Sequence, residues 1–141
     1  MLTDGTGPVP LSLGTIAELN AWSVPDLEAV VDGPRRVTWA ELHDRTARLA
    51  GALRTKLGAQ RGARIAFLGT NCLETIELFH ATARAGLLCV PLNERLSHAE
   101  LRAIVESVEP TALLCTASHA DLAAELVSGT PAVLVDRKSV V

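Results

Sequence analysis

Aromatic side chains are scarce in this sequence of 141 residues, and Tyr is missing altogether. Aromatic residues make up only 3 % of the chain, so the platforms on which nucleic-acid bases stack are not available. Positive charge is not in excess either, because 13 Lys and Arg stand against 16 Asp and Glu, a formal net charge of −3. Phosphate backbones and anionic membranes attract proteins through an excess of positive charge. We therefore expect no nucleic-acid partner.

Long apolar runs and paired cysteines are absent as well. The longest apolar stretches, such as residues 85–92, are far too short to span a bilayer, and residues 1–14 lack the basic and apolar regions of a secretory signal. Cys72, Cys89 and Cys115 are odd in number, far apart and without a C-x-x-C pair. Cys89 and Cys115 lie in apolar runs and are expected to be core residues. The sequence predicts a cytoplasmic protein without a membrane span.

What the sequence does contain is a regular alternation of two patterns. Hydrophobic residues make up 48 % and charged residues 21 %, which is a globular composition. Short apolar runs alternate with segments of helical period, as in β–α–β units, whose parallel strands are covered on both faces. We predict an α/β fold, an open and mostly parallel sheet with flanking helices. The predicted strands are residues 65–68, 87–90, 112–115 and 132–135.

The amino-terminal part departs from this alternation. Residues 1–14 are rich in Gly, Pro, Ser and Thr and are expected to form a loose lead-in, with a short helix over residues 13–22. Residues 28–31 and 36–38 flank the turn-forming sequence Asp-Gly-Pro-Arg at residues 32–35, which predicts a small hairpin.

Two capping boxes mark the starts of predicted helices. Thr38 with Glu41, and Ser97 with Glu100, have the spacing at which each side chain accepts a backbone N–H of the other residue. Glu41 also stands four residues before Arg45, which predicts an ion pair on the exposed face of the first long helix. We interpret Glu100, with the neighbouring His98, as serving the helix start rather than acid–base chemistry.

Few patterns in the sequence carry chemistry by themselves. The dinucleotide-binding, phosphate-loop and nucleophile-elbow signatures are absent. Glu74, Glu77 and His80 are the one local grouping of metal-ligand types, but a di-metal helix site needs a second Glu-x-x-His copy and further carboxylates. We therefore interpret these three residues as a solvated helix edge. The apolar face of the same helix is predicted to consist of Leu73, Ile76, Phe79 and Ala83.

Five stretches, in this order, resemble one family. They are Val-Pro-Asp at residues 24–26 before the apolar residues 29–31, Val-Thr-Trp-Ala-Glu-Leu at 37–42, Arg-Gly-Ala-Arg-Ile-Ala at 61–66, the helix at 71–86, and Val-Pro-Leu-Asn-Glu-Arg-Leu at 90–96. The set resembles the amino-terminal part of the AMP-forming adenylate ligases, the superfamily of acyl-CoA synthetases, luciferases and peptide-synthetase adenylation domains. The sequence departs from the family's pattern at Ala63 and Glu94.

This resemblance implies the first subdomain of the ligase amino-terminal domain, truncated, and a two-step reaction. A small carboxylic acid attacks ATP to give an acyl-adenylate and pyrophosphate, and a thiol, usually that of CoA, then takes the acyl group, with Mg²⁺ offsetting phosphate charge. The full-length protein would therefore use ATP, Mg²⁺ and CoA. The Lys-containing Ser/Thr/Gly-rich loop, the ribose-binding Asp and the carboxyl-terminal Lys of the family all lie downstream. We expect no catalytic residue in this chain and no activity of the chain alone.

Arg95 is the one candidate binding residue. In some CoA ligases of this family the Arg of the corresponding loop lies near the nucleotide phosphate of CoA, which the resemblance implies for Arg95. Open α/β sheets bind ligands past the carboxyl ends of their strands, and a guanidinium suits a phosphate. The alternative interpretation is a solvated loop cation. Asn93 is expected to fix the turn rather than to touch a ligand.

Residues 136–141 resemble nothing in the family. Written back into codons with a stop, they can read GAT CGG AAG AGC GTC GTG TAG, which is similar to a common sequencing adapter. We expect residues 15–135 to be a partial ligase domain and residues 136–141 to be an artefactual tail. The alternative is a non-catalytic α/β binding module or a decayed ligase remnant. The acyl substrate, the thiol acceptor and the oligomeric state stay open.

Overall fold

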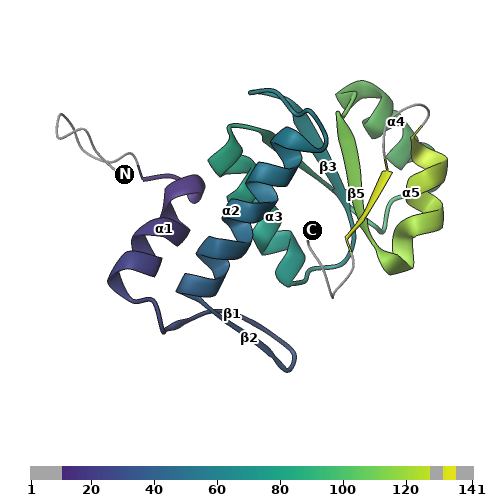
Figure 1. Cartoon of the computed structure of the whole chain (residues 1–141). Helices are drawn as coiled ribbons and strands as arrows, with labels where there is room; N and C mark the ends of the chain where they lie inside the picture. Colours follow the sequence, from purple (N-terminus) through teal and green to yellow (C-terminus); the bar gives the residue numbers. More distant parts are fainter. Residues whose placement is uncertain (1–10, 128–131, 136–141) are drawn as a thin grey trace.

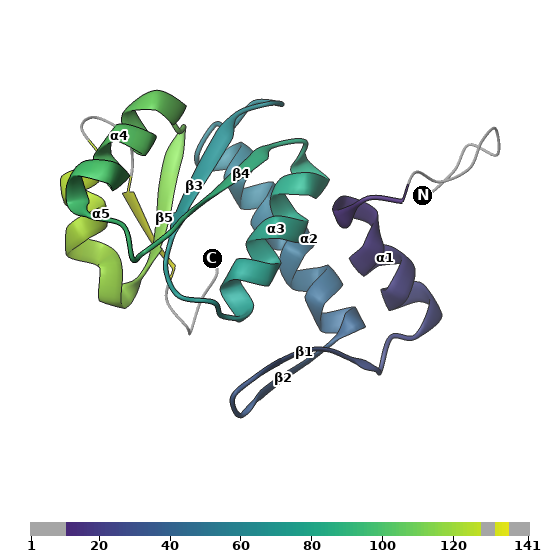
Figure 2. The same ribbon diagram turned by 180° about the vertical axis from the view of Figure 1, so that it is seen from behind.

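The computed structural model describes residues 11–127 and 132–135, which form a parallel sheet between two layers of helices (Figure 1, Figure 2). The helices are α1 (Leu13–Ser23), α2 (Trp39–Thr55), α3 (Leu73–Ala85), α4 (His98–Val108) and α5 (Ala120–Leu126). On one face of the sheet lie α2 and α3, with α1 packed on their outer side, and on the other face lie α4 and α5. The predicted open α/β fold is confirmed.

Within the described residues the sheet has four strands, all parallel, in the order β4-β3-β5-β6. They are β3 (Arg64–Leu68), β4 (Leu88–Leu92), β5 (Ala112–Thr116) and β6 (Ala132–Val135). Strand β3 lies between β4 and β5, and its Ile65 is opposite Cys89 of β4 and Ala112 of β5. Helical crossovers connect the successive strands, so all their carboxyl ends lie at one edge of the sheet.

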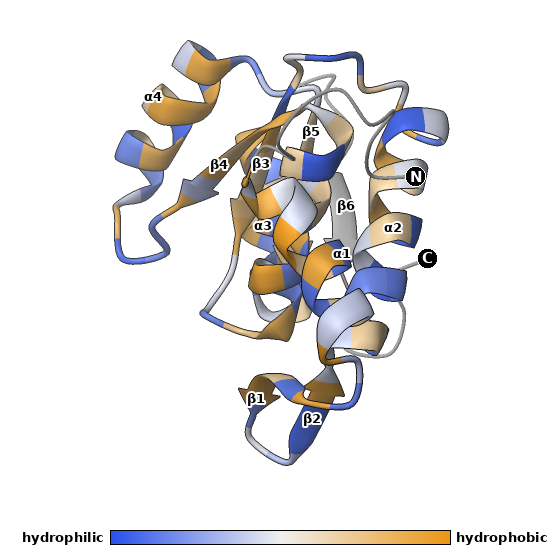
Figure 3. Ribbon diagram, turned by 90° about the vertical axis from the view of Figure 1, so that its left-hand side faces the viewer, coloured by the Kyte–Doolittle hydropathy of each residue, from blue (hydrophilic) through white to orange (hydrophobic). Residues whose placement is uncertain are grey.

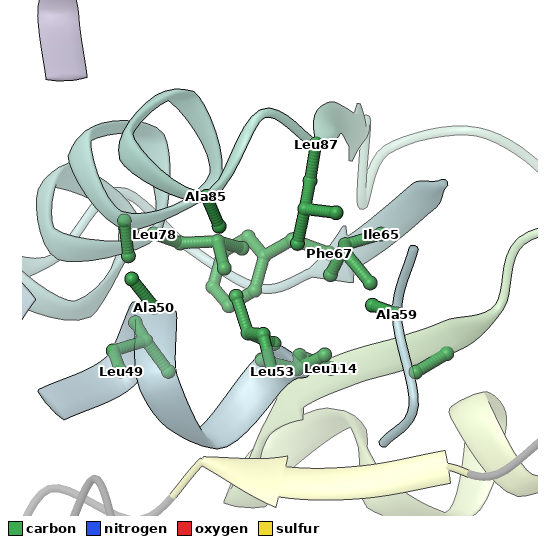
Figure 4. Close-up of a cluster of buried hydrophobic side chains, with 12 residues drawn as sticks. Leu49, Ala50, Leu53, Ala59, Ile65, Phe67, Leu78, Ala85, Leu87 and Leu114 are labelled. Atoms are coloured by element: carbon green, nitrogen blue, oxygen red, sulfur yellow. The ribbon is translucent and has the colours of Figure 1, made fainter. Parts of the chain in front are cut away.

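Alternate residues of β3 belong to two separate cores. Ile65 and Phe67 pack with α2 and α3, whereas Ala66 and Leu68 pack with α4 and α5. Figure 3 colours β3 and β4 largely as hydrophobic, and Figure 4 shows the core on the α2–α3 side. All four residues are at most 3 % exposed. A strand buried on both faces needs a continuous apolar run, which is why the sequence pattern identified it.

Both predicted capping boxes are present. Thr38 Oγ1 accepts the Glu41 N–H at 3.3 Å and the Glu41 carboxylate accepts the Thr38 N–H at 2.8 Å. In the second box, Ser97 Oγ accepts the Glu100 N–H at 3.3 Å and the Glu100 carboxylate accepts the Ser97 N–H at 2.8 Å. Hydrogen bonds from the capping residues hold the pKa of both Glu side chains below the ordinary value of 4.5.

Most of the predicted elements shift by one residue at one boundary, and the end of β4 shifts further. β4 runs to Leu92 rather than ending at residue 90, because it is an edge strand, where Pro91 is tolerated. The following loop therefore begins at Asn93. α1 begins at Leu13, as predicted, and ends at Ser23, one residue beyond the prediction. Residues 1–10 and the predicted tail lie outside the described residues.

The predicted hairpin is formed by β1 (Glu28–Asp32) and β2 (Arg35–Thr38), which pair antiparallel. It lies at the amino-terminal end of α2, beyond the layer formed by α2 and α3 (Figure 2). Val37 of the hairpin is buried in a small third core with Ala17 of α1, Leu42 of α2 and Leu73 of α3.

α1 approaches α3 closely at Gly14. A Cβ placed on Gly14 would lie 2.9 Å from the backbone N of Arg84 in α3. The carbonyl oxygen of Leu13 in α1 lies 2.7 Å from Nδ1 of His80 in α3. Only a residue without a side chain permits this spacing between the two backbones.

The buried face of α3 agrees with the prediction only in part, since Leu73 is buried and Phe79 half-buried as predicted. Ile76 is 38 % exposed and Ala83 is also exposed. Glu74, Glu77 and His80 are instead 3 %, 0 % and 8 % exposed. The interpretation of these three residues as a solvated helix edge is therefore wrong. Elements earlier in the chain, namely α1, α2 and the hairpin, cover this face and supply polar partners.

Arg35 of the hairpin holds Glu74. Its Nη1 donates to Glu74 Oε1 at 2.5 Å and its Nη2 to Oε2 at 3.1 Å, and it also pairs with Asp32. Burial raises the pKa of Glu74, but hydrogen bonds, that of Arg35 foremost, outweigh burial and hold this pKa below its ordinary value of 4.5. Asp32 in turn accepts the Leu73 N–H at 3.0 Å, at the start of α3.

Arg45 of α2 holds Glu77. Its Nε donates to Glu77 Oε1, while Oε2 is buried and has no hydrogen-bond partner within the described residues. The prediction of an ion pair between Arg45 and Glu41 is wrong, because Glu41 binds Thr38 and Arg45 binds the buried Glu77. A buried carboxylate requires a partner, whereas an exposed pair on a helix contributes little.

We expect Gly14→Ala to lower the free energy of unfolding by about 1–3 kcal/mol, because the added methyl group meets the backbone of α3. The matched control is Gly51→Ala in α2, where an added Cβ meets nothing within 4 Å. This control should raise stability by up to about 1 kcal/mol through helix propensity. Urea unfolding followed by circular dichroism measures both. Equal effects of the two variants would contradict the close approach of α1 and α3.

We expect Arg45→Met to lower the free energy of unfolding by about 3–5 kcal/mol, because it leaves the Glu77 carboxylate buried and unpaired. Arg48→Met, one turn along α2, is the control, since exposed Arg48 pairs with no residue that the structure describes. This control should change stability by less than about 0.5 kcal/mol. Adding Glu77→Met to Arg45→Met should recover most of the loss in urea unfolding. A loss for Arg45→Met as small as the control's would refute the buried pair.

Candidate functional site

Two loops and a short 3-10 helix meet at the carboxyl edge of the sheet. Residues 69–71 and 93–96 are the loops after β3 and β4, and the 3-10 helix η1 (Ala117–His119) follows β5. The chain leaves β3 toward α3 on one face and leaves the adjacent β5 toward α5 on the other face (Figure 1). Open parallel sheets bind ligands where neighbouring connections diverge in this way.

An open hollow of about 460 Å³ lies between the two loops. Its lining residues are Gly69, Thr70, Asn71, Pro91, Leu92, Asn93, Glu94 and Arg95. Gly69 also brings the first loop against β5, since a Cβ there would lie 2.8 Å from Cγ2 of Thr116. The hollow therefore belongs to the edge that β3, β4 and β5 share.

Arg95 stands on a tight turn beside this hollow. The Asn93 carbonyl accepts the Leu96 N–H at 3.1 Å, and Asn93 Oδ1 accepts the Arg95 N–H at 3.0 Å. The prediction that Asn93 fixes the turn is confirmed. The Arg95 side chain is exposed, and its guanidinium has no hydrogen bond or ion pair with residues 11–127 or 132–135. An unpaired guanidinium is available to an anion.

Glu94, the neighbour of Arg95, has a different partner. Its Oε2 lies 3.0 Å from Nε2 of His119, which follows β5. The other ring nitrogen, Nδ1, lies 2.9 Å from Thr116 Oγ1 and 3.0 Å from Ser118 Oγ. A line of polar contacts thus joins the loop after β4 to η1 after β5.

The resemblance identified Arg95, but His119, Thr70 and Asn71 were not predicted to belong to the site. No local spacing connects these residues, because each follows a different strand. The signal that could have found them is topological, since residues just past the carboxyl ends of adjacent parallel strands converge at one edge.

The residues that the structure describes contain no group of three or more His, Cys, Asp or Glu able to hold a metal ion. Glu74 and Glu77 bind arginines instead. Glu100 caps α4, as predicted. No residue of the described part is therefore assigned to the Mg²⁺ that the resemblance implies, and no step is assigned to a metal in this chain.

None of the three cysteines lines the hollow. Cys115 is buried and Cys89 is half-buried, as expected of core residues, and burial raises the pKa of Cys89 to about 11. Cys72 precedes α3, with its Sγ 3.5 Å from Thr75 Oγ1. No helix in the described part of the chain is long and apolar enough to cross a membrane.

Comparison with known proteins gives consistent matches to CoA ligases. The chain is 38 % identical over 117 residues to feruloyl-CoA synthase of Amycolatopsis sp, which is 79 % of this chain and 24 % of that protein. It is 30 % identical over 123 residues to a medium/long-chain-fatty-acid–CoA/3-oxocholest-4-en-26-oate–CoA ligase of Mycobacterium tuberculosis, which is 87 % of this chain and 22 % of the ligase. The chain thus spans about a quarter of the length of these curated relatives.

The fold matches solved structures of the same kind. The Mycobacterium tuberculosis fatty acyl CoA synthetase superposes with a TM-score of 0.79 at 28 % identity, over 90 % of this chain and 26 % of that chain. A Rhodopseudomonas palustris protein assigned as a long-chain-fatty-acid CoA ligase superposes with a TM-score of 0.83 at 29 % identity. The superposition covers 89 % of this chain and 33 % of that chain. Residues 18–141 match the AMP-binding enzyme family. The chain belongs to this family of adenylate-forming ligases and corresponds to the amino-terminal part of its relatives.

Proposed function

We propose that this chain is the amino-terminal segment of an AMP-forming acyl-CoA ligase and that Arg95 binds a phosphate of CoA. The observation that carries the proposal is the unpaired Arg95 guanidinium beside a polar hollow at the carboxyl edge of the sheet. Family membership and the CoA ligases among the relatives support the choice of ligand.

In the full-length protein, a carboxylate oxygen of the acid attacks the α-phosphorus of ATP and pyrophosphate leaves, which forms the acyl-adenylate. The CoA sulfur then attacks the acyl carbon and AMP leaves. The phosphate groups of CoA remain unchanged in both steps, so a residue that binds them contributes orientation and affinity. Arg95 is assigned that role, because a guanidinium stays charged at any relevant pH and can donate two parallel hydrogen bonds to one phosphate.

The 141-residue chain alone is proposed to be inactive. The Lys-containing Ser/Thr/Gly-rich loop of the family is absent from its sequence. Without groups placed where charge develops on the phosphates, the first step has no stabilisation of its transition state. ATP-dependent formation of a hydroxamate from an acid and hydroxylamine should therefore be at background for this chain.

We expect Arg95→Ala to weaken CoA binding to the chain by roughly 10- to 100-fold, because a charge-assisted hydrogen bond contributes about 1.5–3 kcal/mol. Isothermal titration calorimetry measures the affinity. Arg54→Ala is the matched control, since Arg54 is an exposed arginine in the last turn of α2, which precedes the amino ends of the strands. This control should bind CoA like the unchanged chain.

Pantetheine, which has the thiol arm of CoA but no phosphate, provides the second control. Arg95→Ala should leave its binding unchanged, because the missing charge has no phosphate to meet. Loss of CoA binding in Arg54→Ala as well, or no binding of CoA by the unchanged chain, would leave Arg95 a solvated loop cation and refute the proposal.

A further inference from the structure

We propose that His119 is a positioning residue that holds the Glu94 carboxylate away from Arg95 and so keeps the guanidinium free for an anion. The identity of that anion, a phosphate of CoA, rests on the proposed function. The positioning itself depends only on side chains of this chain.

The contact between Glu94 and His119 is well defined. Oε2 of Glu94 and Nε2 of His119 are 3.0 Å apart, and the two side chains are 32 % and 16 % exposed. His119 is fixed from its other side, since Thr116 Oγ1 and Ser118 Oγ lie 2.9 and 3.0 Å from Nδ1. Because both ring nitrogens are engaged, the imidazole has one orientation.

A neutral imidazole can make one hydrogen bond from each ring nitrogen in this arrangement. With the proton on Nε2, the ring donates to the Glu94 carboxylate, and Nδ1 accepts a hydrogen bond from the hydroxyl of Thr116 or Ser118. The arrangement therefore does not depend on protonating His119. His119 thus determines where the Glu94 carboxylate lies.

The position of this charge matters because Glu94 and Arg95 are the two central residues of one turn. Both side chains line the same hollow. A carboxylate released from His119 can pair with the adjacent guanidinium or repel an approaching phosphate, and either effect weakens anion binding.

His119 is suited to this task because β5 supports it. Thr116 is the last residue of β5, and its methyl group lies against Gly69 after β3. The imidazole is thus anchored on the central strands, while Glu94 and Arg95 belong to an exposed turn. A donor fixed on the sheet therefore restricts the Glu94 carboxylate on the loop.

Calorimetry on the full chain tests the proposal by rescue. His119→Ala should weaken CoA binding about three- to fivefold, in line with one partly exposed charge interaction. Adding Glu94→Gln should restore the affinity of the unchanged chain, because the competing charge is gone. The matched control is His98→Ala. His98 is an exposed residue at the start of α4, and its Nδ1 lies 3.7 Å from Oε2 of Glu125 in α5, so its removal should leave CoA binding unchanged.

A second readout needs no ligand. The NMR signal of the Arg95 Nε–H should shift in His119→Ala, as Glu94 turns to the guanidinium, and should return in His119→Ala/Glu94→Gln. If the unchanged chain does not bind CoA, the proposed function fails, and the NMR series alone decides the role of His119. An unshifted Arg95 signal in His119→Ala would overturn the positioning role, as would a loss of CoA affinity that Glu94→Gln does not restore.

Discussion

Burial of β3 on both faces is the constraint on which the rest of the structure depends. Ile65 and Phe67 require the cover of α2 and α3, and Ala66 and Leu68 require that of α4 and α5. Because β4 and β5 pair with β3 in parallel, every connection must cross a face of the sheet as a helix. The same geometry gathers the connections after β3, β4 and β5 at one edge, where Arg95, Glu94 and His119 lie.

A second constraint holds the amino-terminal elements in place. Glu74 and Glu77 lie on the buried face of α3, and each pairs with an arginine from an earlier element, Arg35 of the hairpin or Arg45 of α2. Such pairs add little net stability compared with apolar packing, but removing one partner is costly. We interpret them as specifying how α2 and the hairpin dock on α3, since a shifted docking would leave a buried charge unpaired.

The alternation of strands and helices, the hairpin and both capping boxes could be predicted because their signals are local. The buried face of α3 could not, since the partners that make Glu74 and Glu77 tolerable there are about 30–40 residues away in the sequence. The site divides in the same way. A family resemblance identified Arg95. The contact of Glu94 with His119 could not be predicted, because it depends on how β4 and β5 align on the two sides of β3, and no spacing in the sequence reports that alignment.

This chain is proposed to be the amino-terminal part of an acyl-CoA ligase. The most direct test is to amplify the source locus across the codons for Val135 and Asp136 and to sequence the product by a method that uses no adapter. We expect the reading frame to continue beyond residue 135 into a Gly/Ser/Thr-rich loop that contains a Lys. A genomic stop codon directly after Val141 would contradict the proposal and would leave a binding module or a decayed ligase remnant.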